Sequence, residues 1–383
     1  AEEDKLALHR FKADESYQVG RGPHLARDMG PIEAYLSIPE ILRVAKLSGA
    51  DAIHPGYGLL SESPEFAEAC AQAGLTFIGP SPETMRRLGN KVSARQLAEQ
   101  VKVPVVPATG PLPEDMAEVK TLAKAVGYPV MLKASWGGGG RGMRVIRAEA
   151  DLAREVTEGK REAKAAFGKD EVYLEKLVER ARHIEVQILG DAHGQVVHLY
   201  ERDCSIQRRN QKVVERAPAP FLTQAQRDEV CGHALKLARA VNYLAAGTVE
   251  FLMNADTGAF YFIEVNPRIQ VEHTVTEEVT GIDIVKAQIR LVQGARIGTA
   301  ASGVTAQQDI ELNGHALQCR ITTEDPEQNF IPDYGRITAY LGATGFAIRL
   351  DGGTISGNIT LAGSTTLGNS GTNVAATFSG VIS

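Results

Sequence analysis

The chain has 383 residues, 43% of them hydrophobic and 23% charged, an ordinary composition for a globular protein with room for about two or three domains. Its net charge of -6 at pH 7 argues against a general nucleic-acid-binding role, which would require a basic surface. No stretch approaches the roughly 18 apolar residues that a membrane-spanning helix needs.

The cysteines and the first residues indicate the setting of the chain. Cys70, Cys204, Cys231 and Cys319 lie far apart, without metal-ligand spacing and without a secretory signal. We therefore expect reduced thiols in a cytoplasmic protein. The chain starts Ala1-Glu-Glu-Asp rather than with Met, so we expect a fragment of a longer protein.

Residues 1–113 are expected to form an α/β domain that ends in a linker. The predicted elements are a helix at 32–47, a strand at 50–53, a helix at 64–73, a strand at 75–78 and a helix at 91–100. Such alternation predicts a parallel sheet covered by helices. The turn His54-Pro-Gly-Tyr-Gly58 follows a strand, where open α/β sheets bind ligands, although His54 itself is expected to be structural. The Pro-rich stretch 103–113 marks the boundary.

Residues 114–178 are expected to form a small α+β unit around a glycine-rich hairpin. Two apolar runs flank the four glycines Gly137 to Gly140, with Lys133 before them and Arg141 after them. Bare N–H groups in such a loop can approach phosphate oxygens closely. Neither a Walker loop nor a dinucleotide-binding turn fits, since no Gly-Lys-Ser/Thr and no helix follow. A flap over nucleotide phosphates and a mobile surface hairpin both remain open.

The same unit is completed by a charged helix at 150–167, which we interpret as a solvated face, and a strand at 172–177. Residues 179–353 then change to strands. The predicted elements there are strands at 183–189, 196–201, 248–252 and 260–266, with helices at 224–240 and 282–292. A larger antiparallel sheet backed by helices accommodates this pattern.

The hairpin at 248–266 carries two facing acids. If residues 254–258 form the turn, antiparallel pairing places Glu250 opposite Glu264, and Asn266 shares the face of Glu264. Like charges opposite each other destabilise a sheet unless something compensates them. Two carboxylates and an amide oxygen suit Mg²⁺, so we favour a metal site over a solvent-exposed face.

Directly after this hairpin, Arg268, Gln270 and Glu272 occupy alternate positions. In an extended segment they would point to one place, where a cation, an amide and a carboxylate could bind a small oxyanion and remove its proton. Ordinary surface polarity is the alternative. The pair Glu272-His273 lacks the zinc-protease spacing, which disfavours a catalytic zinc.

A third polar stretch, residues 201–212, mixes charges of both signs. A nucleic-acid patch would be basic and would carry aromatic residues, and this stretch has neither property. We interpret it as an ion-pair network that shapes a wall of the active site rather than as a plain surface loop. Residues 354–383 differ again, because they carry no charge and are rich in Gly, Ser, Thr and Asn. They are typical of a linker or a β-repeat, and we assign them no catalytic role.

Taken together, these segments resemble the biotin carboxylase component of biotin-dependent carboxylases, which has the ATP-grasp fold. The resemblance covers residues 1–353. Its motifs are Phe11-Lys-Ala-Asp-Glu-Ser, His54-Pro-Gly-Tyr-Gly, Gly89-Asn-Lys-Val, Lys133-Ala-Ser-Trp-Gly-Gly-Gly-Gly-Arg-Gly-Met, Glu201-Arg-Asp-Cys-Ser and Arg268-Ile-Gln-Val-Glu-His. The stretches from Glu272 and from Thr322 most resemble the pyruvate carboxylase branch. The implied architecture is a parallel α/β N-terminal domain, a glycine-flap lid and a larger antiparallel-sheet domain.

The resemblance also implies a set of site residues. For ATP it implies Lys91, Lys133, Gly138, Gly139, Glu175, Lys176, Val178, His183, Gln207 and Leu252. For Mg²⁺ or Mn²⁺ it implies Glu250, Glu264 and Asn266, for bicarbonate Lys212, Arg268, Gln270 and Val271, and for biotin Tyr57, Gly58 and Arg349. Glu272 would take the proton of bicarbonate, and Arg349 would stabilise an enolate-like biotin.

The implied chemistry is ATP-dependent formation of carboxyphosphate from bicarbonate, followed by carboxylation of biotin held on a carrier domain. The implied partners are that carrier, a carboxyltransferase domain and further copies of the chain. The family opens with a strand, a helix and a strand before the equivalent of Glu2, so we expect a shortened first domain. Two alternatives stay open: another ATP-grasp ligase that joins a carboxylate to an amine, and a non-catalytic nucleotide-binding fragment or chimera.

Overall fold

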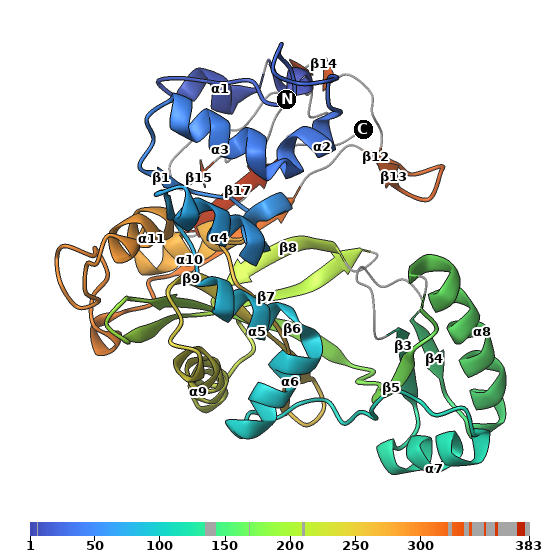
Figure 1. Cartoon of the computed structure of the whole chain (residues 1–383). Coiled ribbons are helices and arrows are strands. Elements are labelled where there is room, and N and C mark those ends of the chain that lie inside the picture. The colour runs from blue at the N-terminus through green and yellow to red at the C-terminus, as the bar shows by residue number, and fades with distance from the viewer. Residues whose placement is uncertain are drawn as a thin grey trace.

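A computed structural model describes residues 1–5, 7–134, 143–167, 169–208, 211–320, 324–332, 337–338, 348–349, 357–358 and 374–379. Along the chain these residues form an α/β unit, a small three-stranded unit and a large sheet flanked by helices (Figure 1). Within the described residues, no helix is both long and apolar enough to cross a membrane.

The first unit confirms the predicted parallel pairing. Its strands β1 (Ala52–Ile53) and β2 (Thr76–Phe77) run parallel. Around them lie η1 (Glu2–Asp4), α1 (Leu8–Lys12), α2 (Pro31–Leu36), α3 (Ile38–Leu47), η2 (Leu59–Glu62), α4 (Pro64–Gln72), α5 (Pro82–Gly89) and α6 (Lys91–Gln100). The single helix predicted at 32–47 is wrong. The backbone is extended at Ser37, whose side chain accepts a hydrogen bond from the Glu40 N–H and so starts a second helix.

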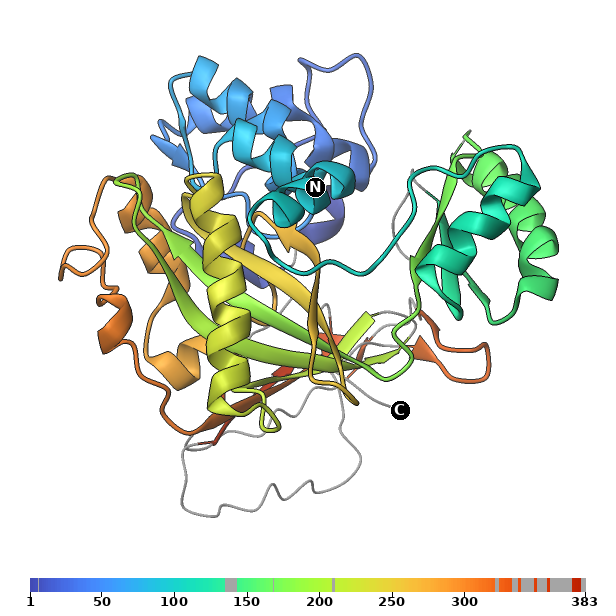
Figure 2. The same ribbon diagram turned by 90° about the horizontal axis from the view of Figure 1, so that it is seen from below.

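The second unit contains the two strands that the glycine hairpin predicts, paired with a third strand. It contains α7 (Met116–Val126), β3 (Val130–Ala134), β4 (Arg144–Ile146), α8 (Glu149–Phe167) and β5 (Val172–Lys176), with antiparallel sheet order β4-β3-β5. Val130, Leu132 and Leu174 of the sheet pack in one cluster with Val119 and Leu152 of the helices. In both views this unit stands to one side of the large sheet (Figures 1 and 2). The glycines Gly137 to Gly140 lie outside the described residues.

The large sheet has the strand order β10-β9-β6-β7-β8-β11-β17-β15. Its strands are β6 (Ala181–Gly190), β7 (Val196–Arg208), β8 (Gln211–Ala217), β9 (Ala245–Asn254), β10 (Phe260–Asn266), β11 (His315–Arg320), β15 (Ile348–Arg349) and β17 (Val374–Ser379). The pairs from β10 through β11 are antiparallel, as predicted, whereas β17 runs parallel to both of its neighbours. The uncharged tail therefore contributes at least one strand, β17, to this sheet.

Helices cover both faces of the large sheet. Helix α9 (Gln224–Ala240) crosses one face, and α10 (His273–Thr280) and α11 (Ile284–Val292) lie on the other (Figure 2). The remaining described elements are η3 (Gln307–Asp309), β12 (Glu324–Asp325), β13 (Ile331–Pro332), β14 (Ile337–Thr338) and β16 (Gly357–Asn358). The sequence reading had not included α5, α10, β8 or β11.

Strand β6 shows how the two faces differ. Ile184, Val186 and Ile188 pack with α9 in one apolar cluster. Glu185 and Gln187, on the alternate positions, are equally buried but point to the α10 side. Because buried charged groups need partners, the α10 face of the sheet is where a polar site must be built.

Candidate active site

A buried arginine organises the α10 face of the sheet. Arg202 of β7 is completely buried, and its Nε lies 2.6 Å from Glu185 Oε1. Its two terminal nitrogens donate to Gln187 (2.8 Å), Thr276 (3.0 Å), Thr248 (3.2 Å) and Gln270 (3.0 Å). Every nitrogen of the guanidinium is thus satisfied, and β6, β7, β9 and α10 are fixed to one another through it.

Lys212 of β8 lies among three carboxylates. Its Nζ contacts Glu185, and it donates to Glu250 Oε1 (2.9 Å) and to Glu272 Oε1 (2.6 Å). Burial alone would lower the pKa of Lys212, but these carboxylates outweigh burial and raise it well above its ordinary value. The ammonium group therefore stays charged and holds the three carboxylates close to one another.

The predicted pairing of two acidic residues on β9 and β10 is confirmed, since Glu264 is the register partner of Glu250. Their side chains have different surroundings. Glu250 is buried and accepts hydrogen bonds from Asn266 (2.9 Å) and Gln270 (2.9 Å), whereas Glu264 is paired with Lys91 at 3.0 Å. Burial opposes ionisation of Glu250, but the pKa of this carboxyl is lowered because Lys212 and His183 outweigh burial.

The donor set around Glu250 suits a divalent cation. One ligand atom each of His183, Glu185 and Glu250 lies within 4.8 Å of the others. Hard cations such as Mg²⁺ prefer carboxylate oxygens, which Glu185 and Glu250 supply. Of the three metal ligands that the hairpin predicts, only Glu250 belongs to this group, because Glu264 is paired with Lys91 and the Asn266 amide donates to Glu250. The carboxylates present fit a divalent cation, and Glu185 is an acid that the sequence analysis does not name.

The prediction of an extended segment after β10 is wrong. Residues 267–272 form a bend and a turn that lead into α10, so the alternate residues do not share one direction. Arg268 pairs with Glu62 of the first unit at 2.8 Å and donates to Asn266 at 3.2 Å. Gln270 and Glu272, in contrast, both belong to the cluster. Gln270 donates a hydrogen bond to Glu250, and Glu272 accepts one from Lys212.

An arginine that the sequence reading missed completes the cluster. Arg320 of β11 lies 2.5 Å from Glu272 Oε2, on the carboxylate oxygen that Lys212 does not occupy. Its Nε also lies 2.5 Å from Glu215 of β8. The pairing of β8 with β11 brings Arg320 and Glu215 together, and the sequence analysis predicts neither strand. The side chain of Arg349, which the resemblance implies would stabilise an enolate-like biotin, lies outside the described residues.

The polar stretch 201–212 is an ion-pair network, as interpreted, but it lies in strands β7 and β8. Arg202 and Lys212 face the site, whereas Glu201 turns to the α9 side and pairs with Arg227 at 3.0 Å. Within the described part of the stretch, Arg202 and Lys212 therefore belong to the site wall and Glu201 does not.

The residues predicted for ATP are divided between the units. Lys133 of β3 pairs with Glu175 of β5 in the small unit, where Lys176 donates to the carbonyls of Gly127 (2.8 Å) and Tyr128 (2.7 Å). In the large sheet His183 is the register partner of Leu252, and Gln207 that of Lys212. Val178 follows β5, and Gly138 and Gly139 lie outside the described residues.

The remaining predicted residues lie on turns. His54 is held by contacts to Gln288 (3.2 Å) and the Gly56 N–H (3.1 Å), in keeping with a structural role. Tyr57 is exposed, and Gly58 begins η2 with a positive φ of 79°. The Val271 carbonyl accepts a hydrogen bond from Gln318 at 3.4 Å.

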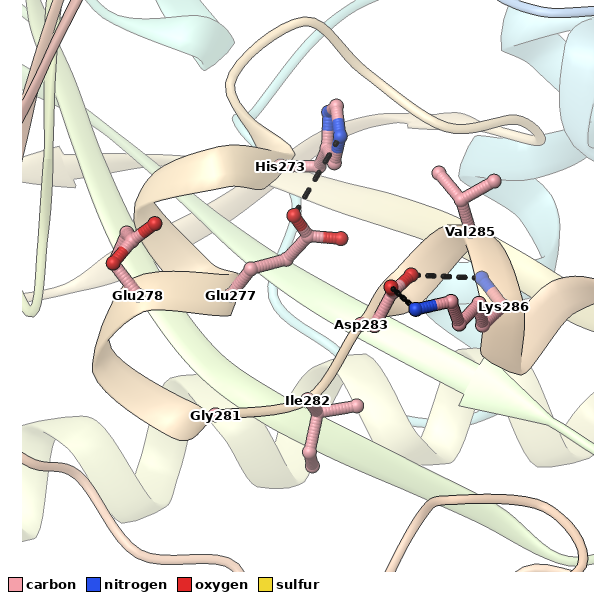
Figure 3. A pocket seen from close by; sticks show the side chains of 8 residues that line it. All are labelled: His273, Glu277, Glu278, Gly281, Ile282, Asp283, Val285 and Lys286. Atoms are coloured by element: carbon pink, nitrogen blue, oxygen red, sulfur yellow. Dashed lines mark hydrogen bonds and ion pairs between the residues drawn. The ribbon is translucent and has the colours of Figure 1, made fainter. Parts of the chain in front are cut away.

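A cavity of about 520 Å³ lies between α10 and α11. Its lining consists of His273, Glu277, Glu278, Gly281, Ile282, Asp283, Val285 and Lys286. In Figure 3 His273 and Glu277 point toward each other, and the Lys286 ammonium lies 3.1 Å from Asp283. None of the residues predicted to bind substrate lines it, so we assign it no part in the reaction.

Known proteins match nearly the whole chain. Residues 1–85 match the family "Biotin carboxylase, N-terminal domain", and residues 90–300 match "Carbamoyl-phosphate synthase L chain, ATP binding domain". Pyruvate carboxylase of Bacillus subtilis (strain 168) is 51% identical over 353 residues, which make up 92% of this chain and 30% of that protein.

Solved structures agree with this match. A pyruvate carboxylase structure from Rhizobium etli gives a TM-score of 0.84 at 77% identity, covering 94% of this chain and 32% of that one. The biotin carboxylase domain of Hydrogenobacter thermophilus 2-oxoglutarate carboxylase, solved with MgADP and bicarbonate, gives 0.79 at 45% identity, covering 90% of this chain and 73% of that one.

The fold and the match to the ATP-binding family place the chain in the ATP-grasp class, as the sequence predicts. Within that class, the chain belongs to the biotin carboxylase family. It spans about 30% of the length of the first pyruvate carboxylase it matches.

Proposed function

We propose that the chain carboxylates biotin at the expense of ATP and bicarbonate, as the biotin carboxylase part of a pyruvate carboxylase-like enzyme. The observation that carries this proposal is the carboxylate of Glu272, which lies between the cations of Lys212 and Arg320 (2.6 and 2.5 Å). Two cations can bind a small anion such as bicarbonate, and a carboxylate held between them can accept the proton of that anion.

In this function Lys212 and Arg320 attract bicarbonate, and Glu272 removes its proton. An oxygen of the resulting dianion attacks the γ-phosphorus of ATP, ADP leaves, and carboxyphosphate forms. Its carbon–oxygen bond to phosphate then breaks to give CO₂ and phosphate, which takes the N1 proton of biotin. Biotin N1 attacks CO₂. We assign the stabilisation of the enolate-like biotin oxygen to Arg320, because its side chain stands beside Glu272.

Glu250 and Glu264, with Asn266 beside them, would hold Mg²⁺ or Mn²⁺. The cation supplies charge neutralisation on the ATP phosphates. Lys91 and Lys133 are expected to contact the same phosphates. In the described structure each pairs with a carboxylate, Glu264 and Glu175 respectively, and ATP would have to replace those contacts.

The larger assembly is proposed from the relatives. Proteins named pyruvate carboxylase match the chain over about 30% of their length, and one relative is described as a complete multifunctional enzyme. We infer that the biotin is carried by a separate carrier domain, that a carboxyltransferase domain passes the carboxyl group to pyruvate, and that the complete protein is a cytoplasmic homo-oligomer.

The test is ADP release by the full chain, measured with and without bicarbonate and free biotin. We expect release to require bicarbonate and to rise with biotin. In Glu272→Ala we expect turnover to fall by about 100-fold or more, the usual effect of losing a general base, with ATP affinity kept.

Glu278→Ala is the matched control, because this exposed glutamate lies six residues further along and outside the cluster. It should retain wild-type turnover. If the wild type cleaves ATP at the same rate with and without bicarbonate and biotin, the proposed function is excluded. If Glu272→Ala keeps full activity, the role of Glu272 as the base is excluded.

A further inference from the structure

Behind Arg320 lies a buried carboxylate that the reaction above does not use. Glu215 of β8 is completely buried. Among the described residues its ion pair is with Arg320, whose Nε lies 2.5 Å from Glu215 Oε1. A buried carboxylate with so few partners is costly, which indicates a role other than stability.

The strand pairing fixes this arrangement. Glu215 is the register partner of Gln318 on β11, and Arg320 lies two residues further on the same face. The guanidinium therefore has its Nε edge at Glu215 and a terminal nitrogen 2.5 Å from Glu272. Gln318 is itself held, because it accepts a hydrogen bond from Thr274 at 2.5 Å.

Arg320 of β11 is the cation that contacts Glu215. Glu272 before α10 and Glu185 of β6 add negative charge at Glu215, although both also contact Lys212, and Cys319 of β11 is a neighbouring thiol. Burial, reinforced by the two glutamates, raises the pKa of Glu215 to about 7 despite Arg320. Near neutral pH this carboxyl group therefore exchanges a proton.

We propose that Glu215 is a positioning residue for biotin carboxylation, which holds the Nε edge of Arg320 so that the outer edge stays at Glu272 when bicarbonate and biotin bind. This inference rests on the proposed function. When Glu215 is ionised, its charge holds the guanidinium against Glu272. When it is protonated, that attraction is lost. Only Glu272 and the substrates then position the Arg320 guanidinium.

The test compares Glu215→Gln with the wild type in bicarbonate- and biotin-dependent ADP release between pH 5.5 and 8.5. Glutamine keeps the shape and resembles the protonated acid. Above pH 8 we expect kcat to fall about 10-fold, the size expected for one lost charge-assisted contact. Near pH 5.5 the two proteins should converge, and the KM for ATP should stay unchanged.

Glu201→Gln is the matched control, because Glu201 is another buried glutamate of the same sheet and pairs with Arg227 on the opposite face. The ratio of the kcat of Glu201→Gln to the kcat of the wild type should not change with pH. A loss in Glu215→Gln that is equal at every pH, or no loss, would overturn the inference. A wild type without bicarbonate-dependent ADP release would instead refute the proposed function itself.

Discussion

Arg202 is the residue on which the buried polar cluster depends most. It is completely buried and contacts Glu185, Gln187, Thr248, Gln270 and Thr276. Arg202→Met would leave Glu185 with one cation fewer in a buried site, so we predict a loss of about 3–5 kcal/mol in the free energy of unfolding, measured in urea. Arg154→Met on the exposed face of α8 should cost less than about 1 kcal/mol. Equal effects of the two substitutions would contradict the role given to Arg202.

Acid should unfold the protein through the same cluster. Burial raises the pKa of Glu185, but Lys212 and Arg202 outweigh it and lower the pKa to about 2. A carboxyl whose pKa falls on folding stabilises the protein above its unfolded pKa of about 4.5, and this contribution is lost as the pH falls toward 2. Thermal unfolding should show a melting temperature that decreases over this range. In Glu185→Gln the decrease should be smaller, and an unchanged decrease would show that other groups cause it.

At the residue level, the sequence predicted chemistry where motifs were contiguous. Glu250, Gln270 and Glu272 follow from such motifs and Lys212 from the family resemblance, and the structure places their side chains in contact. Glu185 and Arg320 were not named, because each reaches the cluster through strand pairings that no local pattern specifies.

Among the elements, strand β6 ends at Gly190, where its backbone packs against the backbone of Tyr243. A Cβ on Gly190 would lie 1.8 Å from the carbonyl oxygen of Tyr243, a contact that side-chain movement cannot relieve. Gly190→Ala should therefore destabilise the large sheet by about 2 kcal/mol or more. In contrast, Gly232 lies inside α9, and apart from its chain neighbours and the backbone of its own helix no described atom lies within 4 Å of the added Cβ, so Gly232→Ala should stabilise by about 0.5–1 kcal/mol. Chemical denaturation measures both, and destabilisation of similar size in both would contradict this account.

Elements with strong local signals were predicted well. The bounds of α6 and α9 match the predicted ranges. The predicted pairing of Glu250 with Glu264 is present, but a register shift between Phe262 and Glu264 contributes to it, so the turn alone does not set it. The single helix at 32–47 failed because the cap at Ser37 and the proline after it were overlooked. The segment after β10 failed because alternation of polar residues occurs in turns as well as in strands.

At the scale of the whole molecule, the described residues form three units, and the sequence does not reveal how the site residues are shared between them. Lys133 and Glu175 lie in the small unit, and the carboxylate cluster lies in the large sheet. The ion pair of Arg268 with Glu62 joins the first unit to the large sheet. Such contacts depend on long-range packing, so only the resemblance to a family could anticipate them.

The central claim is that bicarbonate, activated at Glu272, attacks ATP. Its most direct test supplies freshly dissolved oxygen-18 bicarbonate with unlabelled ATP and water, and analyses the released phosphate by mass spectrometry. Because the carbon–oxygen bond of carboxyphosphate breaks, we predict that the phosphate carries an oxygen from bicarbonate. Unlabelled phosphate would mean that water or another group attacks ATP, and it would contradict the account.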